Sequence, residues 1–434
     1  VSADTSFSWT VIGDTNGATV DKAGTSDIDV LSGTATIASG ATSTTFDVTA
    51  SSDSVVEGIE GIKVSVFDSN STALSSSVIL VNNSGSSATS QAFTLTTGVN
   101  EFTGGSGNDN FDASTTANSL NDFDAIDGGD GTDTVTAKLT AADAASSVTP
   151  LLSNVENLSV TYTDTTANDG DVLTVNLAEA TSISSISNIT SNDNASFTNI
   201  GSVAHYTSKS AQGTATLEYD LAALAGTADN MTITVKGTNN TTITLDDDNP
   251  ANTSVLETVT VESLSVANTL AALNTALVNT TTLAVTGDKK LTITAALDAD
   301  IATIDASGSS GGLTLTNAPA SLAPTVIGSS GADAITVGAA NINISGGAGN
   351  DTVTAAGTWN GSDIYDGGDG TDTLAITTSF EPLNTGPTSA NTIAAGLSNV
   401  EKLVMTGAAT ALSFDKPMGA LNTIDISDTN VQTV

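Results

Sequence analysis

The nonapeptide GGDGTDTVT, residues 128–136, is the stretch of this sequence that decides the fold. Its pattern is Gly-Gly-x-Gly-x-Asp-x-apolar-x, and three more copies keep every fixed position. They are GGSGNDNFD from Gly104, GGAGNDTVT from Gly346 and GGDGTDTLA from Gly367. A short repeat of this kind predicts a parallel β-roll, in which each coil stacks on the one before it.

Degenerate copies lie beside the intact ones. SLNDFDAID from Ser119 keeps Asp124, GSSGADAIT from Gly328 keeps Asp333, and TWNGSDIYD from Thr358 keeps Asp363. The copies therefore form two clusters, each of three to five coils.

The residue types in the repeat favour calcium. Calcium takes roughly six to eight oxygen ligands, and glycines let a tight turn direct its carbonyls toward an ion. The Asp at position six adds charge, and the apolar residue at position eight begins a strand. A thin coil buries little apolar surface, so several bound ions are expected to supply much of the folding free energy. A plain Gly-Asp turn is the alternative.

The predicted metal-site residues follow from position. The carboxylates of the intact copies rank first and those of the degenerate copies next, together with the glycines at positions one and four of the intact copies. These residues are Asp109, Asp133, Asp351, Asp372, Asp124, Asp333, Asp363, Gly104, Gly107, Gly128, Gly131, Gly346, Gly349, Gly367 and Gly370. Neighbouring carboxylates are second-rank ligands or solvated turn residues: Asp112, Asp127, Asp130, Asp366 and Asp369.

Composition agrees with this reading. Lys and Arg total 9 against 48 Asp and Glu, a net charge of −39, and Asp outnumbers Glu about fourfold. Nucleic acid and anionic membranes are therefore poor partners. The chain has no Cys, so disulfides and thiolate metal sites are excluded. No apolar run is long enough to predict membrane insertion.

The chain is rich in Thr, Val and Gly with short apolar alternations, which predicts an all-β fold. One exception is residues 266–282, VANTLAALNTALVNTTT, where Leu270, Leu273 and Leu277 suggest a short helix. The segments at both ends resemble interrupted strands, so we expect a fragment of a longer protein.

A larger duplication is visible above the nonapeptide. GGDGTDT recurs at Gly128 and Gly367, 239 residues apart, and LSNVE recurs at Leu152 and Leu397, 245 residues apart. A module of roughly 240 residues, consisting of roll, spacer, LSNVE strand and β-rich body, is therefore repeated.

Residues 27–68 resemble a Calx-β domain, with Asp53, Glu57, Gly58 and Glu60 at its D-x-x-x-E-G-x-E turn. The resemblance implies an antiparallel β-sandwich. Asp27, Asp53, Glu57 and Glu60 are turn residues or calcium ligands on this reading.

The nonapeptides resemble those of RTX proteins, and the region from residue 98 onward resembles bacterial RTX surface-layer proteins. The expected order is a Calx-β-like sandwich, a first roll, a β-rich solenoid or sandwich body, a second roll and a truncated second body: 1–97, 98–145, 146–325, 326–376 and 377–434.

This resemblance implies a secreted, structural, calcium-dependent subunit of a surface layer (S-layer) on the bacterial cell. Its partners would be copies of itself in a two-dimensional lattice, and a cell-surface polysaccharide held through a region outside this chain. Export would be by type I secretion. A giant RTX adhesin or extracellular filament protein is the alternative, favoured by the Calx-β-like block.

No enzymatic activity is expected. His205 is the sole histidine, and without Cys or Arg the usual protease, esterase and zinc sites cannot be built. His205 is expected on the surface or half-buried in a strand. The acidic run Leu245–Pro250 is expected to be a solvated turn, with one more ion-binding loop as the alternative.

Overall fold

The computed structural model describes most of the chain. The described residues are 2–13, 21–22, 32–46, 48, 59–82, 90–141, 145–167, 169–248, 255–275, 278–318, 324–338, 341–356, 359, 362–377, 396–405 and 421–426. Within them every regular element is a β-strand except one short 3₁₀ turn, η1 (Leu221–Leu224). The all-β prediction is confirmed.

The chain divides into two compact units. Unit 1 comprises residues 1–93, 100–111 and 125–134, and unit 2 comprises residues 94–99, 112–124 and 135–434. Three short strands lie within residues 92–113, where the chain alternates between the two units: β6 (Ala92–Thr94), β7 (Glu101–Thr103) and β8 (Asn110–Ala113). In unit 1, β7 pairs in parallel with β9 (Ala125–Asp127).

The N-terminal block of unit 1 is a five-stranded sheet. Its strands are β1 (Thr5–Gly13), β2 (Asp21–Lys22), β3 (Ser32–Ile37), β4 (Ile59–Phe67) and β5 (Ala73–Asn82). β1 runs antiparallel to β3 and β4, and β5 antiparallel to β4. Trp9 and Val11 are buried, and the Trp9 ring stacks on Phe46 at 4.7 Å. The predicted sandwich needs a second facing sheet, so that part stays a prediction.

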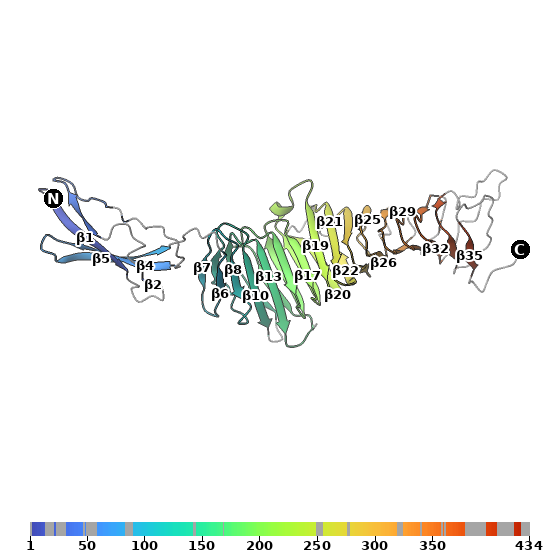
Figure 1. The fold of residues 1–434 in the computed structure, drawn as a ribbon, viewed down its shortest axis with the longest axis horizontal. Coiled ribbons are helices and arrows are strands. Elements are labelled where there is room, and N and C mark those ends of the chain that lie inside the picture. The colour runs from blue at the N-terminus through green and yellow to red at the C-terminus, as the bar shows by residue number, and fades with distance from the viewer. Residues whose placement is uncertain are drawn as a thin grey trace. The chain divides into compact units, whose positions relative to one another are not determined.

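Unit 2 is built from two long parallel sheets (Figure 1). The first contains β10 (Thr134–Ala141), β13 (Asn157–Asp164), β15 (Ser185–Ile189), β17 (His205–Lys209), β19 (Asn230–Lys236), β21 (Thr258–Leu264), β23 (Thr282–Gly287), β25 (Thr303–Ser309), β27 (Thr325–Ile327), β29 (Asn343–Ser345), β31 (Ile364–Asp366) and β33 (Leu397–Ser398).

The second parallel sheet has 13 strands. In order they are β11 (Ser146–Val148), β14 (Val172–Asn176), β16 (Asn194–Ile200), β18 (Thr214–Tyr219), β20 (Asn239–Asp247), β22 (Asn268–Asn274), β24 (Leu291–Ile293), β26 (Leu313–Leu315), β28 (Ala334–Val337), β30 (Thr352–Ala355), β32 (Thr373–Ile376), β34 (Lys402–Met405) and β35 (Thr423–Ile426). A further strand, β12 (Leu151–Ser153), precedes β13.

Successive coils contribute one strand to each sheet, which makes unit 2 a β-solenoid. In the first sheet, Val261 of β21 pairs with Ile233 of β19 on one side and Val285 of β23 on the other. All three side chains are fully buried, and the residues that alternate with Val261 along β21 are less buried. Alternation along each strand therefore builds continuous apolar columns between the sheets.

The same two sheets continue from the predicted body into the predicted second roll. β25 pairs with β27 and β26 with β28, so ladder pairing crosses residue 325. The strands do shorten: β19 and β21 have seven residues, whereas β28, β30 and β32 have four. The nonapeptide coils thus extend the solenoid with a narrower cross-section.

The predicted helix over 266–282 is wrong, because β22 occupies its centre. Leu270 and Leu273 are both buried, although their spacing does not fit simple alternation. The pairing of β22 with β20 shifts register beside Thr241, and this irregularity turns both leucines inward. Leu277 lies outside the described residues.

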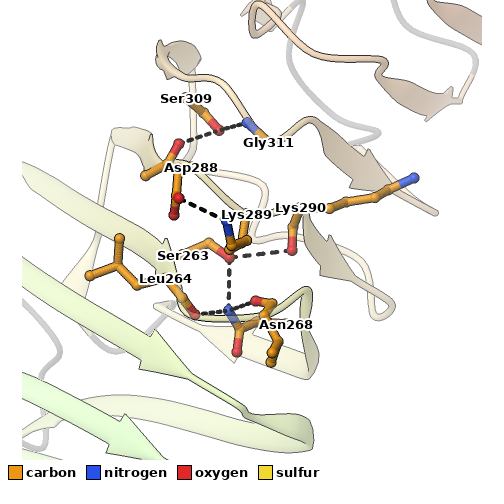
Figure 2. Close-up of polar contacts among 10 residues, drawn as sticks. Ser263, Leu264, Asn268, Asp288, Lys289, Lys290, Ser309 and Gly311 are labelled. Carbon is orange, nitrogen blue, oxygen red and sulfur yellow. Dashed lines mark hydrogen bonds and ion pairs between the residues drawn. The ribbon is translucent and has the colours of Figure 1, made fainter.

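Uncharged side chains close the turn that follows β21 (Figure 2). Asn268 is buried, and its Nδ2 donates to Ser263 Oγ at 2.9 Å, Leu264 O at 3.1 Å and Val266 O at 2.7 Å. Its Oδ1 accepts the Thr238 N–H at 2.9 Å. These bonds satisfy the polar groups of the turn without a charged side chain, so this turn needs no bound ion to close.

Candidate metal centre

Carboxylates form a ladder along the second roll, in unit 2. Asp333, Asp351 and Asp372 precede β28, β30 and β32, at the same place in successive coils. The Asp333 N–H donates to Asp351 Oδ1 at 2.9 Å, and the Asp351 N–H donates to Asp372 Oδ1 at 2.8 Å. All three side chains are at most 3% exposed. The repeat period therefore brings together three acids that are 18 and 21 residues apart.

In the second roll, the outer carboxylate oxygens distinguish the two intact copies from the degenerate copy that contains Asp333. Asp333 Oδ2 accepts the Ser329 N–H at 2.7 Å, and the Ser329 hydroxyl also donates to this carboxylate. By contrast, Asp351 Oδ2 and Asp372 Oδ2 are buried and have no hydrogen-bond partner. A buried carboxylate oxygen without a donor is costly, and a cation would remove that cost.

Backbone carbonyls converge on the same points. A Cβ added to Gly346 would lie 2.5 Å from Asp351 Oδ2 and would clash with the carbonyl of Gly367 in the next coil. A Cβ on Gly367 would lie 2.7 Å from Asp372 Oδ2. The first glycine of each intact copy thus lines a small cradle in which carboxylate and carbonyl oxygens face one another. Hard oxygen donors in this arrangement fit calcium.

Electrostatics point the same way. Burial, the largest cause, raises the pKa of Asp351 to about 7, and the charges of Asp333 and Asp372 add to the effect. Burial also raises the pKa of Asp333 and of Asp372. A row of buried like charges without a cation is unfavourable, so the site is built for positive charge.

Glycine is required at the turn itself. Gly368 has φ of 92° and Gly370 has φ of 150°, and a side chain on either would meet a carbonyl of the preceding turn, that of Gly347 or Gly349. Within the pair of turns, Asn350 Oδ1 accepts the Thr371 N–H at 3.0 Å. The first roll repeats this bond between Asn108 and Thr132. The alternation of Asn and Thr at position five is the sequence signal that reasoning on the motif missed.

The first roll, in unit 1, has the same ladder. Asp109 and Asp133 are buried, and the Asp109 N–H donates to Asp133 Oδ1 at 2.6 Å. Asp109 accepts the N–H groups of Gln91 and Gly105, both at 2.7 Å. Gly104 faces Asp109 Oδ2 and the carbonyl of Gly128, and Gly131 packs on the carbonyl of Gly107. Both oxygens of Asp109 thus accept protein hydrogen bonds.

Asp124 and Asp363 lie apart from these ladders. Asp124 Oδ2 accepts the Asn121 N–H at 2.8 Å within its own turn. Asp363 Oδ1 accepts the Ile342 N–H at 3.1 Å and precedes β31, in the other sheet from the strands that follow Asp351 and Asp372. Both are buried; Asp124 accepts a bond within its own turn, whereas Asp363 accepts one from the preceding coil.

The second-rank carboxylates mostly serve turns. Asp112 accepts from Ser114 and Thr115, and these bonds, that of the Ser114 side chain above all, lower its pKa. Asp127 Oδ1 accepts the Gly129 N–H at 3.2 Å, and Asp366 Oδ1 accepts Asn399 Nδ2 at 2.7 Å. Asp130 and Asp369 are exposed.

One acidic cluster outside the rolls could hold a metal ion. Carboxylate oxygens of Asp164, Asp169 and Asp193 all lie within 4.8 Å of one another. Asp193 accepts the N–H groups of Asn194 and Asp169, and the Tyr162 hydroxyl donates to Asp164 at 3.3 Å. Sequence reasoning missed this cluster, because the three acids follow no recognisable spacing.

The other singled-out residues are structural. His205, on β17, is half-buried, and its Nε2 lies 2.9 Å from Thr234 Oγ1; burial lowers its pKa. Residues 245–247 end strand β20, and Asp248 accepts the Leu221 N–H at 3.0 Å. Of the Calx-β-like turn, Asp27, Asp53 and Glu57 lie outside the described residues, and Glu60 lies on β4.

Among the described residues, no helix is long and apolar enough to span a membrane. A scan against known protein families finds no match for the chain. Searches of curated proteins and of solved structures likewise find nothing similar. The geometry of the carboxylate ladders is therefore the guide to function.

Proposed function

We propose that this chain is a calcium-dependent structural protein of the bacterial cell surface, and that its rolls fold around calcium ions. The observation that carries the calcium assignment is the pair of buried, unpartnered oxygens, Asp351 Oδ2 and Asp372 Oδ2. Each faces a carbonyl of the next coil across a glycine. Calcium suits this donor set because it accepts carbonyl and carboxylate oxygens in irregular geometry, whereas magnesium demands a near-ideal octahedron.

Three residues of the second roll would have distinct roles as calcium ligands. Asp351 and Asp372 would supply charge, and the carbonyl of Gly367 would supply a neutral ligand. A bound cation would offset the repulsion within the ladder and so stabilise the stacking of coils. The turn that closes through Asn268 needs no such charge.

To test the calcium assignment, the protein is first freed of calcium with EGTA and then titrated with calcium. Circular dichroism and protease resistance are measured during the titration. Calcium should increase both signals in the rolls, and magnesium at the same concentration should do so far less. Unchanged protease resistance of the rolls in EGTA would overturn the assignment.

The surface-layer role is the finer part of the proposal. It is supported by the resemblance of the nonapeptide regions and by the net charge of −39, because copies this acidic repel one another unless cations intervene. Electron microscopy of the purified chain in millimolar calcium should show ordered two-dimensional sheets. A monomer that calcium rigidifies and that binds a glycan or host surface would instead support an adhesin.

A further inference from the structure

The second LSNVE motif lies at the end of the second roll. Its first two residues form β33, which pairs with Tyr365 and Asp366 of β31. The strand that follows it, β34, pairs with β32. Asn399, Val400 and Glu401 therefore make the turn between the sheets in the coil directly after the last intact nonapeptide.

The register aligns this three-residue turn with the six-residue GGDGTD turn. The Gly367 N–H donates to Ser398 O at 2.9 Å, just as the Gly346 N–H donates to Asp366 O at 2.7 Å. Asn399 thus occupies the place of the first glycine. At the other end Thr373 pairs with Lys402, so Glu401 occupies the place of the aspartate.

The contacts of the turn match that alignment. The Asp372 N–H donates to Glu401 Oε2 at 2.7 Å, as the Asp351 N–H donates to Asp372 Oδ1 at 2.8 Å. A Cβ on Gly367 would clash with the carbonyl of Asn399, and it would lie 2.7 Å from Asp372 Oδ2. That Oδ2 atom is buried and has no hydrogen-bond partner. A carbonyl and a carboxylate of the shorter turn are therefore presented to an oxygen that needs a cation.

The residue types explain how three residues can replace six. Asn399 has φ of 50°, a left-handed conformation that Asn tolerates better than most residues, and its Nδ2 bond to Asp366 fixes it there. Glu is one methylene longer than Asp, so its carboxylate still reaches the Asp372 N–H from a shortened turn. Asn154 of the first LSNVE has nearly the same φ, 49°.

The backbone bonds of this turn also match those of the nonapeptide coils. In the next coil the Asn422 and Thr423 N–H groups, both at 3.0 Å, donate to the carbonyl of Glu401, as the Glu401 and Lys402 N–H groups donate to the carbonyl of Asp372. Glu401 thus continues the ladder of Asp351 and Asp372 by one coil.

We propose that Asn399 and Glu401 complete the cation site of the last nonapeptide of the second roll, together with Gly367 and Asp372. The inference rests on the proposed calcium function and adds two ligands to it: the Asn399 carbonyl and the Glu401 carboxylate.

The chain contains a matched control. Glu257 Oε2 accepts the Asp229 N–H at 2.7 Å, the same bond as at Glu401. There, however, Asp229 Oδ2 accepts the Gly226 N–H at 3.0 Å, and no orphaned oxygen remains. Glu257→Gln changes the same side chain in the same hydrogen bond without touching a proposed cation site.

The experiment is calcium titration calorimetry of the whole chain and of E401Q and E257Q. E401Q should weaken one site roughly tenfold or more, because a charged ligand is lost, with other sites unchanged. E257Q should titrate like the unmodified chain. If E401Q also titrates like the unmodified chain, the inference fails and the proposed function stands. If the unmodified chain binds no calcium, the proposed function fails.

A second variant covers the case in which E401Q does not fold. Glu401→Asp keeps the charge but withdraws the carboxylate by one methylene from a turn that is three residues short. It should weaken the same site and leave the others intact. Calcium binding by E401D that is indistinguishable from the unmodified chain would overturn the ligand role of Glu401.

Discussion

Asp351 donates its backbone N–H to Oδ1 of Asp372, 2.8 Å away in the next coil, while its own Oδ2 is buried without a partner. One residue thus links two coils through its amide and leaves an acceptor unsatisfied. The same ladder of carboxylates therefore both joins the coils and favours a bound cation.

Asp372→Asn should weaken calcium binding by roughly ten- to a hundredfold, about 1.4 to 2.8 kcal/mol, because a buried charged ligand is replaced by a neutral one. Calorimetry measures the change. Asp300→Asn is the control, since it removes the same charge from an exposed side chain. Equal effects of the two substitutions would indicate nonspecific attraction to an acidic chain.

Calcium removal should act on one part of unit 2 and spare another. In EGTA we expect fast hydrogen exchange at the Asp351 and Thr373 amides, which bridge roll coils. The Asn268 amide, which donates to Lys290 O in the body, should stay protected. Mass spectrometry after hydrogen exchange measures both. Uniform loss of protection across unit 2 would contradict this division.

The calcium-free roll should become more stable in mild acid. The pKa of Asp351 is raised in the folded state from 3.8 to about 7, so the folded chain holds this proton more tightly than the unfolded chain does. The resulting penalty is complete above about pH 7 and is relieved as the pH falls toward 4. The free energy of unfolding in EGTA should therefore rise over that interval.

Asp351→Asn should flatten this pH dependence, because the titrating group is gone. With calcium present the slope should reverse, since protons then compete with the ion for the carboxylate. Denaturant unfolding at several pH values measures both. A calcium-free chain whose stability falls steadily from pH 7 to pH 5 would contradict the raised pKa.

Asn268→Ala should destabilise the body by roughly 2–3 kcal/mol, because it leaves buried partners such as Ser263 and the Thr238 amide unsatisfied. The loss should be the same in calcium and in EGTA, as no cation is involved. Asn274→Ala is the control, because that side chain is exposed. Urea unfolding gives the values, and a calcium-dependent difference would count against an independent body.

The sequence pattern was sufficient to predict those features that depend on residues close together in the chain. The nonapeptide places Asp333, Asp351 and Asp372 one coil apart, and the structure stacks them as the repeat predicts. Alternation in segments such as TVTVESL likewise predicts strands with one buried face, as β21 has.

The features that the sequence did not predict depend on contacts with residues far away in the chain. Leu270 and Leu273 resemble a helix face until the irregular pairing with β20 is known, some 30 residues earlier. Val400 and Glu401 resemble an ordinary strand start, and only the register with Gly367 and Asp372 reveals their part in the roll. Asp164 and Asp193 meet only because the turn from β13 to β14 stacks on the turn from β15 to β16 in the next coil.

Each coil of unit 2 pairs only with the coils beside it, so the solenoid resists tension as a series of separate links. Under load a series yields at its weakest link. If the rolls bind calcium as proposed, the carboxylate coils should be among the stronger links with the ion bound and the weakest once it is withdrawn, while the coil closed by Asn268 should be unaffected. Ambient calcium would therefore decide where along its length the chain gives way.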